Sequence, residues 1–396
     1  MPDSSSSNWD NLKYNKSMNK KTIKVLSIFG TRPEAVKMAP VVQALAKQPG
    51  IESIVCVTAQ HREMLDQVLN LFDIEPHIDL NLMRPNQTLA ELTASIFNNL
   101  DPVLEKVSPD WILVQGDTTT VMAAALNAFY RHILIGHVEA GLRTHDKWAP
   151  FPEEVNRRIA GVVADLHFAP TSLSKRNLLQ EGVAEQCIKV TGNTVIDALR
   201  RIVNEAMPEE IRSLLEEKHI PDRQKRLIVI TAHRRENFGE PIREICRAIK
   251  DIALNNADSM ELVYPVHLNP NIQAPAHEIL DGIPNVTLLS PIEYLPLIQL
   301  MKHATLVLTD SGGIQEEATG LGIPTLVLRE VTERPEGVEA GVLKLVGTDY
   351  QKIVSETTKL LDDPQYYHAM AHAANPYGDG HAAERIVDEI MRYSLD

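Results

Sequence analysis

The sequence predicts an α/β protein of two domains, each a doubly wound parallel sheet, that face each other across a central cleft. From residue 24 onward, short apolar and β-branched runs alternate with longer segments of helical periodicity. Continuous apolar strands separated by helices indicate a parallel sheet covered on both faces. The alternation restarts near residue 227, and 396 residues exceed what one typical core supports.

The expected elements follow from these patterns in chain order. In the first half, β-branched runs predict strands at residues 25–29, 53–58, 111–115, 133–137 and 166–169. Helical periodicity predicts helices between them at 33–47, 89–106, 119–130 and 152–163. In the second half the expected strands are 227–231, 261–266, 285–288, 305–308 and 324–328. Helices are expected among them at 241–256 and 295–303.

Three segments indicate how the domains are bounded. A polar helical stretch at 207–218 separates the two sets of strands, and we expect domains at 22–195 and 196–376. The last helical pattern has no strand after it, so we expect residues 377–396 to pack back on the N-terminal domain. Residues 1–21 are rich in Ser, Asn and Lys and lack periodicity, which predicts disorder, and Met18 is a second candidate start.

Composition limits the classes of function. The net charge is −14, so neither a nucleic acid nor an acidic membrane is expected as a partner. No apolar run approaches the roughly 20 residues of a spanning helix, and the first 20 residues are too polar for a secretory signal. Cys56, Cys187 and Cys246 are scattered, which is typical of a reducing compartment. We therefore expect a cytoplasmic protein of enzyme size.

The turn between Leu308 and Glu317 is the most informative segment. It follows an apolar strand and opens a helix, so its backbone N–H groups face any ligand, and the helix N-terminus favours an anion such as phosphate. Gly312 and Gly313 allow close approach. Glu317, one turn further on, could accept hydrogen bonds from sugar hydroxyls. Phosphate beside a polyol suggests a nucleotide-sugar; an ordinary strand-to-helix turn is the alternative.

Polar residues also follow the strands of the first half. Arg32 precedes a helix and could bind a phosphate, with Lys37 one turn further along the same side. A surface pair beside a capped helix is the alternative. Asp117 follows a strand and is a candidate general base. It could instead cap the helix at residue 119, although the threonines after it can do so without it.

Two glutamates are further candidates. Glu139 follows an apolar strand, where burial would raise its pKa and suit it to proton transfer, and pairing with Arg143 is the alternative. Glu153 opens a helix, where it could only complement the helix dipole or could pair with Arg157, one turn away. For Glu154 we expect only a favourable interaction with the helix dipole.

Two turns of the second half each carry a histidine. His233, followed by Arg234, comes after one strand, and His267 comes after the next. A lone histidine is more often structural, but two at the same end of one sheet, beside the Gly-Gly turn, indicate diphosphate binding. Gln60 and His61 form another polar cluster at a strand-to-helix junction. The remaining histidines lack ligand spacing, so no metal is expected.

Six motifs together resemble the non-hydrolysing UDP-N-acetylglucosamine 2-epimerases, and they run in order from about residue 22 to the C-terminus. They are Gly30-Thr-Arg-Pro-Glu-Ala-Val-Lys37, Gln115-Gly-Asp-Thr118, His137-Val-Glu-Ala-Gly-Leu-Arg143, Pro150-Phe-Pro-Glu-Glu154, His233-Arg-Arg-Glu-Asn237 and Asp310-Ser-Gly-Gly-Ile-Gln-Glu-Glu317. The resemblance implies two Rossmann-like domains of the glycosyltransferase B type and a homodimer. It also implies interconversion of UDP-GlcNAc and UDP-ManNAc, which supplies surface polysaccharide synthesis.

The resemblance also implies roles for single residues. Ser311 and Gly312 would contact phosphate, Glu317 the ribose hydroxyls, and Arg32 and His233 the diphosphate. The acid and base would be drawn from three carboxylates supported by a lysine, namely Asp117, Glu139, Glu153 and Lys37. Members of this family expel UDP from C1, after which a carboxylate removes the C2 proton to give a 2-acetamidoglucal. UDP adds back once a proton has reached the opposite face.

Other inferences bear on cofactors and control. No G-x-G-x-x-G fingerprint follows either first strand, so no NAD and no other cofactor is expected. Bacterial members also bind a second UDP-GlcNAc as an activator, and the matching segments here contain Gln60, His61 and Glu153, a candidate effector site. Glu63 and Asn86 replace the Gln and Arg of strongly regulated members, which argues against that control.

Three alternatives stay open. A hydrolysing epimerase would release free ManNAc and UDP, but Pro33-Glu34 with Lys37 differs from the usual sequence of those relatives. A UDP-sugar glycosyltransferase shares the expected architecture, and fold alone does not exclude it. A non-enzymatic UDP-sugar sensor is disfavoured by so many placed carboxylates.

Overall fold

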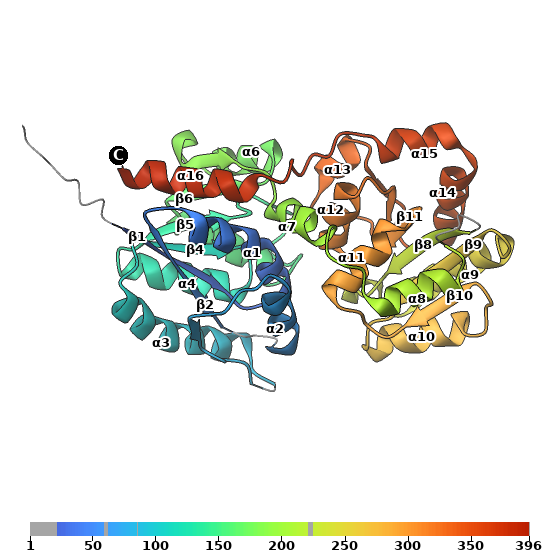
Figure 1. The fold of residues 1–396 in the computed structure, drawn as a ribbon, viewed down its shortest axis with the longest axis horizontal. Helices are drawn as coiled ribbons and strands as arrows, with labels where there is room; N and C mark the ends of the chain where they lie inside the picture. The colour runs from blue at the N-terminus through green and yellow to red at the C-terminus, as the bar shows by residue number, and fades with distance from the viewer. Residues whose placement is uncertain (1–21, 59–61, 85, 221–224, 396) are drawn as a thin grey trace, which may run out of the picture.

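The computed structural model describes residues 22–58, 62–84, 86–220 and 225–395. This part of the chain forms two α/β lobes side by side, the N-terminal one in blue to green and the C-terminal one mainly in yellow to orange (Figure 1). Each lobe holds one parallel sheet with helices around it, so the predicted fold class is confirmed. The expected disorder of residues 1–21 falls outside the described residues.

The N-terminal sheet has the strand order β3-β2-β1-β4-β5-β6-β7, and all its pairs are parallel. Its strands are β1 (Ile23–Phe29), β2 (Ile51–Val57), β3 (Ile78–Asp79), β4 (Trp111–Gln115), β5 (Leu134–Val138), β6 (Leu166–Ala169) and β7 (Ile188–Val190). Its helices are α1 (Arg32–Lys47), α2 (Arg62–Leu71), α3 (Leu89–Val107), α4 (Thr119–Tyr130), α5 (Glu153–Val163) and α6 (Ser172–Gln180). Val25 belongs to the apolar cluster beneath α1 and Leu26 to the cluster beneath α3, as expected for a strand buried on both faces.

The strand order reverses at β1, which pairs with β2 on one side and with β4 on the other. At such a switch point the helices leave in opposite directions and a crevice opens at the carboxyl ends of the strands. Gly30 follows β1 there, and a Cβ on it would lie 2.0 Å from Thr58 Oγ1, so the turn requires glycine. The Glu34 carboxylate accepts from the N–H groups of Gly30 (3.0 Å) and Thr31 (2.7 Å), which fixes the turn that carries Arg32.

The C-terminal sheet has the order β10-β9-β8-β11-β12-β13, again parallel. Its strands are β8 (Arg226–Thr231), β9 (Met260–Pro265), β10 (Val286–Leu289), β11 (Leu306–Thr309), β12 (Thr325–Val327) and β13 (Leu343–Leu345). Its helices are α8 (Glu209–Glu217), α9 (Glu240–Asn255), α10 (Pro270–Leu280), α11 (Tyr294–Lys302), α12 (Gly312–Gly320), α13 (Pro335–Glu339), α14 (Tyr350–Asp362) and α15 (Pro364–Ala371). The reversal lies at β8, so the turns after β8, β9 and β11 share one edge of the sheet.

Two helices connect the lobes. α7 (Thr194–Ile202) packs against α1 of the first lobe and α12 of the second. α16 (Ala382–Leu395), red in Figure 1, runs back over the N-terminal lobe and packs on α1. There Trp111 meets Tyr393 edge to face at 5.2 Å and donates from Nε1 to Ser394 Oγ at 2.9 Å. One apolar cluster contains residues of both lobes and of α7, so the junction is a packed core.

The expected elements that the structure contains begin and end within two residues of their predicted limits. The sequence pattern does not predict β3, β7 and β13, each only two or three residues long. In the described part of the chain, no helix is long and apolar enough to cross a membrane.

Candidate active site

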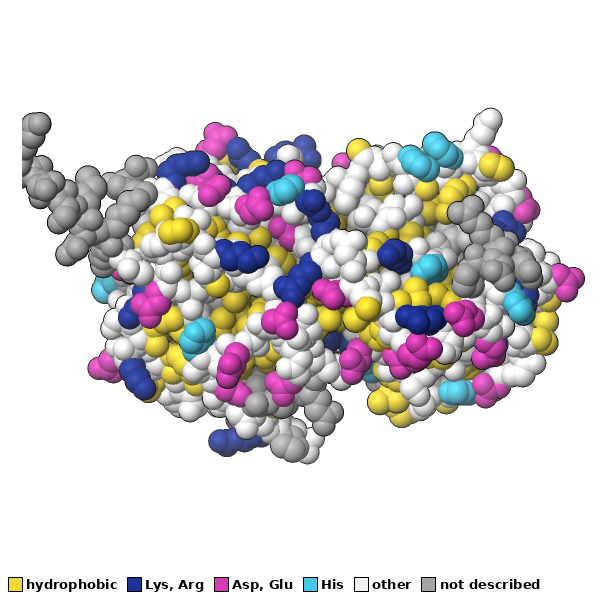
Figure 2. Space-filling view, viewed as in Figure 1, with side chains coloured by type: hydrophobic (Ala, Val, Ile, Leu, Met, Phe, Trp, Pro, Cys, Tyr) yellow, Lys and Arg dark blue, Asp and Glu magenta, His cyan; other side chains and the backbone are white. Residues whose placement is uncertain are grey.

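The carboxyl ends of both sheets border a cavity of about 1530 Å³ between the lobes. The N-terminal lobe contributes Thr31, Thr118 and Glu153 to its lining, and the C-terminal lobe contributes His233 and His267. On the face shown in Figure 2, acidic and basic side chains are interspersed over both lobes. An anionic ligand would therefore be held by individual cations and backbone N–H groups of the cavity.

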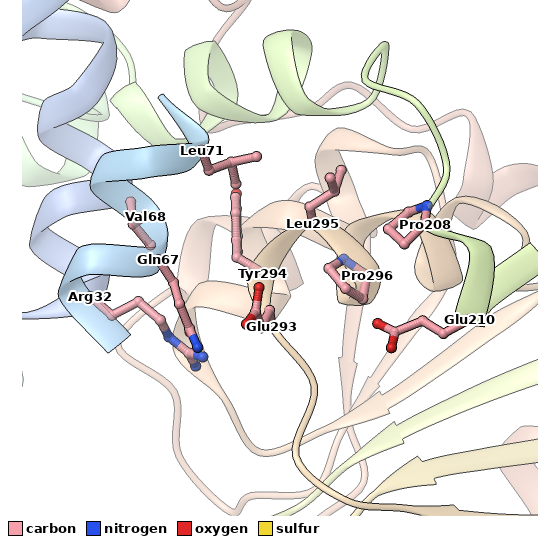
Figure 3. A pocket seen from close by; sticks show the side chains of 10 residues that line it. All are labelled: Arg32, Gln67, Val68, Leu71, Pro208, Glu210, Glu293, Tyr294, Leu295 and Pro296. Carbon is pink, nitrogen blue, oxygen red and sulfur yellow. The ribbon is translucent and has the colours of Figure 1, made fainter. Parts of the chain in front are cut away.

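A second, smaller cavity of about 320 Å³ lies between the lobes and is shown in Figure 3. Arg32 and Gln67 extend into it from the N-terminal lobe, opposite Glu293 and Tyr294 at the start of α11. Arg32 thus lines this smaller cavity, while its neighbour Thr31 lines the larger one. Arg32 also acts on the pKa of His233, which lines the larger cavity, so the two cavities adjoin at the turn after β1.

The turn between β11 and α12 has the features expected of an anion site. Ser311 is the N-cap of α12, but its side chain makes no capping hydrogen bond, which leaves the first N–H groups of the helix available. A Cβ on Gly312 would lie 2.9 Å from Arg334 Nη1, so the absence of a side chain lets a guanidinium pack on the helix start. Among the described residues nothing lies within 4 Å of such an atom on Gly313.

Asp310, just before this turn, has a role that the sequence does not reveal. Its fully buried carboxylate accepts from the N–H groups of His233 and Arg234 at 2.8 Å each, and from Asn237 Nδ2 at 3.0 Å. These bonds tie the turn after β8 to the turn after β11. The only sequence signal is its position beside the glycines. Asp310 therefore fixes His233 relative to the anion turn.

His233 and His267 lie together, as the sequence predicts. Their rings stack at 5.7 Å with 16° between the planes. Burial lowers the pKa of His233, and the Asp310 carboxylate opposes this effect, with its Oδ1 3.5 Å from His233 Nδ1. Both rings line the larger cavity.

Asp117 follows β4 and does not cap α4, because Thr118 accepts the hydrogen bond from Val121 N–H. The Asp117 carboxylate instead forms an ion pair with Arg157 of α5. The pairing of Arg157 with Glu153 that helical spacing suggests is therefore wrong, since the guanidinium turns toward Asp117 and Glu154.

Glu154 also differs from its expectation. It is fully buried and accepts from the N–H groups of Thr144 (3.1 Å) and His145 (3.2 Å) in addition to its contact with Arg157. An exposed residue would interact only with the helix dipole. This one holds the loop after β5 against α5.

The environment of Glu153 favours the protonated form of its carboxyl. Burial raises its pKa, the Asp117 carboxylate raises it further, and Arg157 and Arg234 oppose these effects. Its buried Oε2 has no hydrogen-bond partner among the described residues. Glu153 is thus suited to keep a proton at a higher pH than an exposed glutamate does.

Glu139 has the opposite environment. It has φ of +63° and its carboxylate accepts from Lys37 Nζ, Gln115 Nε2 and Asn193 Nδ2, the last at 3.1 Å. Burial acts to raise its pKa, but Lys37 and then Arg334 more than offset this, and the pKa is lowered. The expectation of a raised pKa is therefore wrong.

The alternative partner predicted for Glu139 is wrong as well. Arg143 binds Glu181 with two nitrogens, at 2.8 and 2.7 Å.

Lys37 connects the two lobes through charged contacts. Besides Glu139, its Nζ lies 3.4 Å from Glu316 Oε2 of α12, and the other oxygen of Glu316 accepts from Arg334 Nε at 2.9 Å. Burial acts to lower the pKa of Lys37, but the two glutamates outweigh it and the pKa is raised. The sequence shows the residue types of Glu316 and Arg334 but gives no sign that they meet.

Glu317 is also buried, and burial raises its pKa to about 7, an effect that the nearby Tyr294 hydroxyl opposes. The candidate effector residues Gln60 and His61 fall outside the described residues. Within the described ranges, no group of three or more His, Cys, Asp and Glu side chains could hold a metal ion.

Comparisons with known proteins agree on one family. A family model described as UDP-N-acetylglucosamine 2-epimerase matches residues 43–391. The UDP-N-acetylglucosamine 2-epimerase of Escherichia coli K12 is 55% identical over 370 residues, which cover 93% of this chain and 98% of that protein. The crystal structure of UDP-GlcNAc 2-epimerase from Neisseria meningitidis bound to UDP-GlcNAc is 50% identical, with a TM-score of 0.85 over 93% of this chain and all of that one. A UDP co-structure of S. aureus MnaA is 47% identical, with a TM-score of 0.86 over 94% of this chain and 97% of that one.

Proposed function

Since this chain belongs to the UDP-N-acetylglucosamine 2-epimerase family, we propose that it interconverts UDP-GlcNAc and UDP-ManNAc by eliminating UDP from C1 and adding it back. The chain is an isomerase by its family. The observation that carries the elimination route is the cavity between the lobes, which has two histidines on one side and Glu153 on the other. The turn between β11 and α12 is tied to one of these histidines, because Asp310 accepts from His233 N–H. Leaving group and reacting carbon would then be handled by different lobes.

The chemistry explains why the diphosphate must be held beside the carboxylates. C2 of the sugar bears no carbonyl, so its proton is not acidic enough for direct removal. Loss of UDP creates positive charge at C1, which acidifies the C2 proton, and cations around the diphosphate stabilise the departing charge. A carboxylate then takes the proton, the C2–H electrons form the C1–C2 double bond, and a second carboxyl returns a proton to the other face.

In this proposal the C-terminal lobe binds UDP. Backbone N–H groups at Ser311, Gly312 and Gly313 receive the phosphate, and Glu317 receives the ribose hydroxyls. Three side chains complete the diphosphate site, namely the guanidinium of Arg32 and the imidazoles of His233 and His267.

The N-terminal lobe supplies proton transfer. Asp117 and Glu153 are the groups that exchange protons with the sugar, because Glu153 lines the cavity at the start of α5 and Asp117, which is bonded to Asn156 of α5, immediately precedes Thr118 of the cavity lining. Glu139 is proposed as a fixed negative charge that Lys37 compensates, since its carboxylate already accepts three hydrogen bonds.

One experiment separates this route from the alternatives. UDP-GlcNAc is incubated in heavy water without an acceptor, and the products are followed by NMR. We expect UDP-ManNAc with deuterium at C2. Free ManNAc with stoichiometric UDP would indicate a hydrolysing epimerase, and unchanged UDP-GlcNAc a transferase or a sensor. UDP-ManNAc that keeps its original hydrogen would contradict elimination and re-addition.

We further propose that the enzyme is a homodimer. Large apolar side chains are exposed on α4 and α5, with Tyr130 65% and Val162 84% accessible. A second copy is the occupant that the family resemblance implies. Sedimentation equilibrium should give twice the mass of one chain, and Val162→Lys should weaken the association.

The proposed setting is the cytoplasm, with surface polysaccharide synthesis as the use of the product. All three cysteines are free thiols, and Cys56 and Cys246 are buried. Free thiols are typical of proteins from a reducing compartment.

A further inference from the structure

Helix α5 meets the turn after β4 through two consecutive residues. Asn156 Nδ2 donates to the Asp117 carbonyl oxygen at 3.0 Å, and the Arg157 guanidinium donates through Nη2 to Asp117 Oδ2. Glu153 projects from the same helix face, because residues three and four positions apart are neighbours on a helix. The Arg157 side chain is 6% exposed and the Asp117 side chain 26%. The arginine is thus behind Asp117, away from solvent.

We propose that Arg157 is a positioning residue for the epimerisation: it holds the Asp117 carboxylate in the orientation that the reaction needs and leaves Glu153 to carry the proton. This inference rests on the proposed function, in which both carboxylates exchange protons with the sugar. Arg157 itself forms no bond to substrate.

The Arg157 guanidinium is held by two carboxylates, those of Asp117 and Glu154. Its Nη1 lies 3.3 Å from Glu154 Oε2, and Glu154 is itself fixed by the N–H groups of Thr144 and His145. Two contacts through different nitrogens fix the plane of a guanidinium as well as its position. The orientation of the Asp117 carboxylate is therefore set by a buried residue that is itself immobilised.

Glu153 lines the cavity and Asp117 immediately precedes Thr118 of its lining, but the two carboxylates differ in their partners. Glu153 Oε2 has no hydrogen-bond partner within the described residues, whereas Asp117 has a direct cation. The charged groups that act on Glu153 are Asp117, Arg157 and, from the other lobe, Arg234. Two carboxylates in such different environments divide into an acid and a base.

The proposed cycle balances protons and electrons. The C1–O bond breaks and its electrons leave with UDP. Asp117 then takes the C2 proton, and the C2–H electrons become the C1–C2 double bond. Glu153 returns a proton to the opposite face of C2, and the electrons of UDP re-form the bond at C1. Exchange with solvent resets both carboxyls.

The test uses Arg157→Gln. We expect kcat to fall about 10²-fold, the loss that a small displacement of a reacting group causes. UDP affinity should change less than about two-fold. With substrate deuterated at C2, the kinetic isotope effect should increase, because proton removal becomes slow relative to the other steps. A residue needed only for folding would not increase it.

Two further variants serve as controls. Arg158→Gln removes the adjacent arginine, whose side chain is 51% exposed, and should leave kcat and the isotope effect unchanged. Arg157→Lys keeps the charge without the forked geometry, so it should recover part of kcat while retaining the larger isotope effect. This variant also carries the test if Arg157→Gln does not fold.

A combination with Asp117→Asn distinguishes this inference from the proposed function. If both residues act as one unit, Asp117→Asn with Arg157→Gln should be no slower than Asp117→Asn alone. The role of Arg157 would be overturned if the loss of kcat in the double variant were the product of the two single losses. It would also be overturned if Arg157→Gln left the isotope effect unchanged and reduced UDP affinity. Near-normal activity of Asp117→Asn alone would instead overturn the proposed role of Asp117.

Discussion

Two adjacent glutamates of α12 have contrasting electrostatic environments. Glu316 contacts two cations, Lys37 and Arg334, whereas burial raises the pKa of Glu317 to about 7. Glu316 contacts the N-terminal lobe through Lys37. The negative charge of Glu317 is unfavourable in its buried position. This is common where a bound ligand supplies the missing hydrogen-bond donors.

This contrast predicts a gain in stability for Glu317→Gln above neutral pH. A carboxyl with pKa 4.5 when unfolded and about 7 when folded holds more protons in the folded state between these values. The free energy of unfolding of the wild type therefore falls as pH rises from about 4.5 to about 7. The variant has no carboxyl at this position, so its free energy of unfolding does not fall in this way. It should be more stable than the wild type at pH 8 by up to about 3 kcal/mol and equally stable near pH 4. Thermal unfolding at both pH values measures the difference.

The same variant should bind UDP more weakly, because a neutral amide accepts from ribose hydroxyls less well than a carboxylate. Glu339→Gln, on an exposed position of α13, is the matched control and should change neither quantity. Equal stability differences at pH 4 and pH 8 would show that burial of this charge is not the cause.

The sequence predicts which single residues belong to the site, but it does not predict which side chains they contact. Asp117, Glu139 and Glu153 all follow from their places after strands or at a helix start. The charge state of Glu139 depends on Lys37, 102 positions away in the chain. Arg157 likewise turns to a partner 40 positions away instead of one turn along its helix. Helical spacing describes neighbours within one element only.

At the scale of an element, the two glycines that open α12 have different functions. Gly312 leaves room for the Arg334 guanidinium, while the position of a Cβ on Gly313 is open among the described residues. The fold therefore needs glycine at the first position. At the second, glycine is explained by the proposed approach of the phosphate.

Gly313→Ala should separate these functions. Glycine within a helix is less favourable than alanine by up to about 1 kcal/mol, so the variant should be as stable as the wild type or slightly more stable. Its UDP affinity, measured by calorimetry, should nevertheless fall about 10-fold if phosphate lies against this residue. Gly312→Ala is the contrasting variant and should lose stability, because the new methyl group meets Arg334. Unchanged UDP affinity in Gly313→Ala would move the phosphate away from it.

The strands of four or more residues were all predicted from the sequence, and of the shorter strands only β12 was. Long amphipathic helices and apolar strands of four or more residues have a period that is visible in sequence. β3, β7 and β13 have two or three residues each, so alternation cannot show in them. β3 and β7 form the two edges of the first sheet and β13 one edge of the second, where pairing needs a strand on one side only.

At the scale of the whole molecule, the two lobes meet through both apolar and charged contacts. The chain crosses near residue 193 and again near residue 377, where Asn193 N–H donates to the Tyr377 carbonyl oxygen at 2.7 Å. The sequence predicts two domains from the restarted alternation. It does not predict which side chains join them, because the ions of the junction lie far apart in the chain. The chain of ions from Glu139 through Lys37 and Glu316 to Arg334 is the clearest case.

Lys37→Met should therefore destabilise the whole molecule. The change leaves Glu139 and Glu316 buried without their shared cation, and loss of one partner from a buried ion pair costs about 3–5 kcal/mol. Glu316→Gln should cost less, because Lys37 keeps Glu139. Thermal unfolding followed by circular dichroism measures both. Lys47→Met, at the exposed end of the same helix, is the control and should change stability by no more than about 0.5 kcal/mol.

The double variant decides whether the charges act across the junction. With Glu316 neutral, removal of Lys37 leaves one unpaired carboxylate in place of two. The combined loss should therefore be smaller than the sum of the single losses by about 1 kcal/mol or more. Additive losses would mean that Lys37 acts only within the N-terminal lobe, through Glu139. Coupling would mean that the lobe proposed to bind UDP and the lobe proposed to move protons are held in register by one buried lysine.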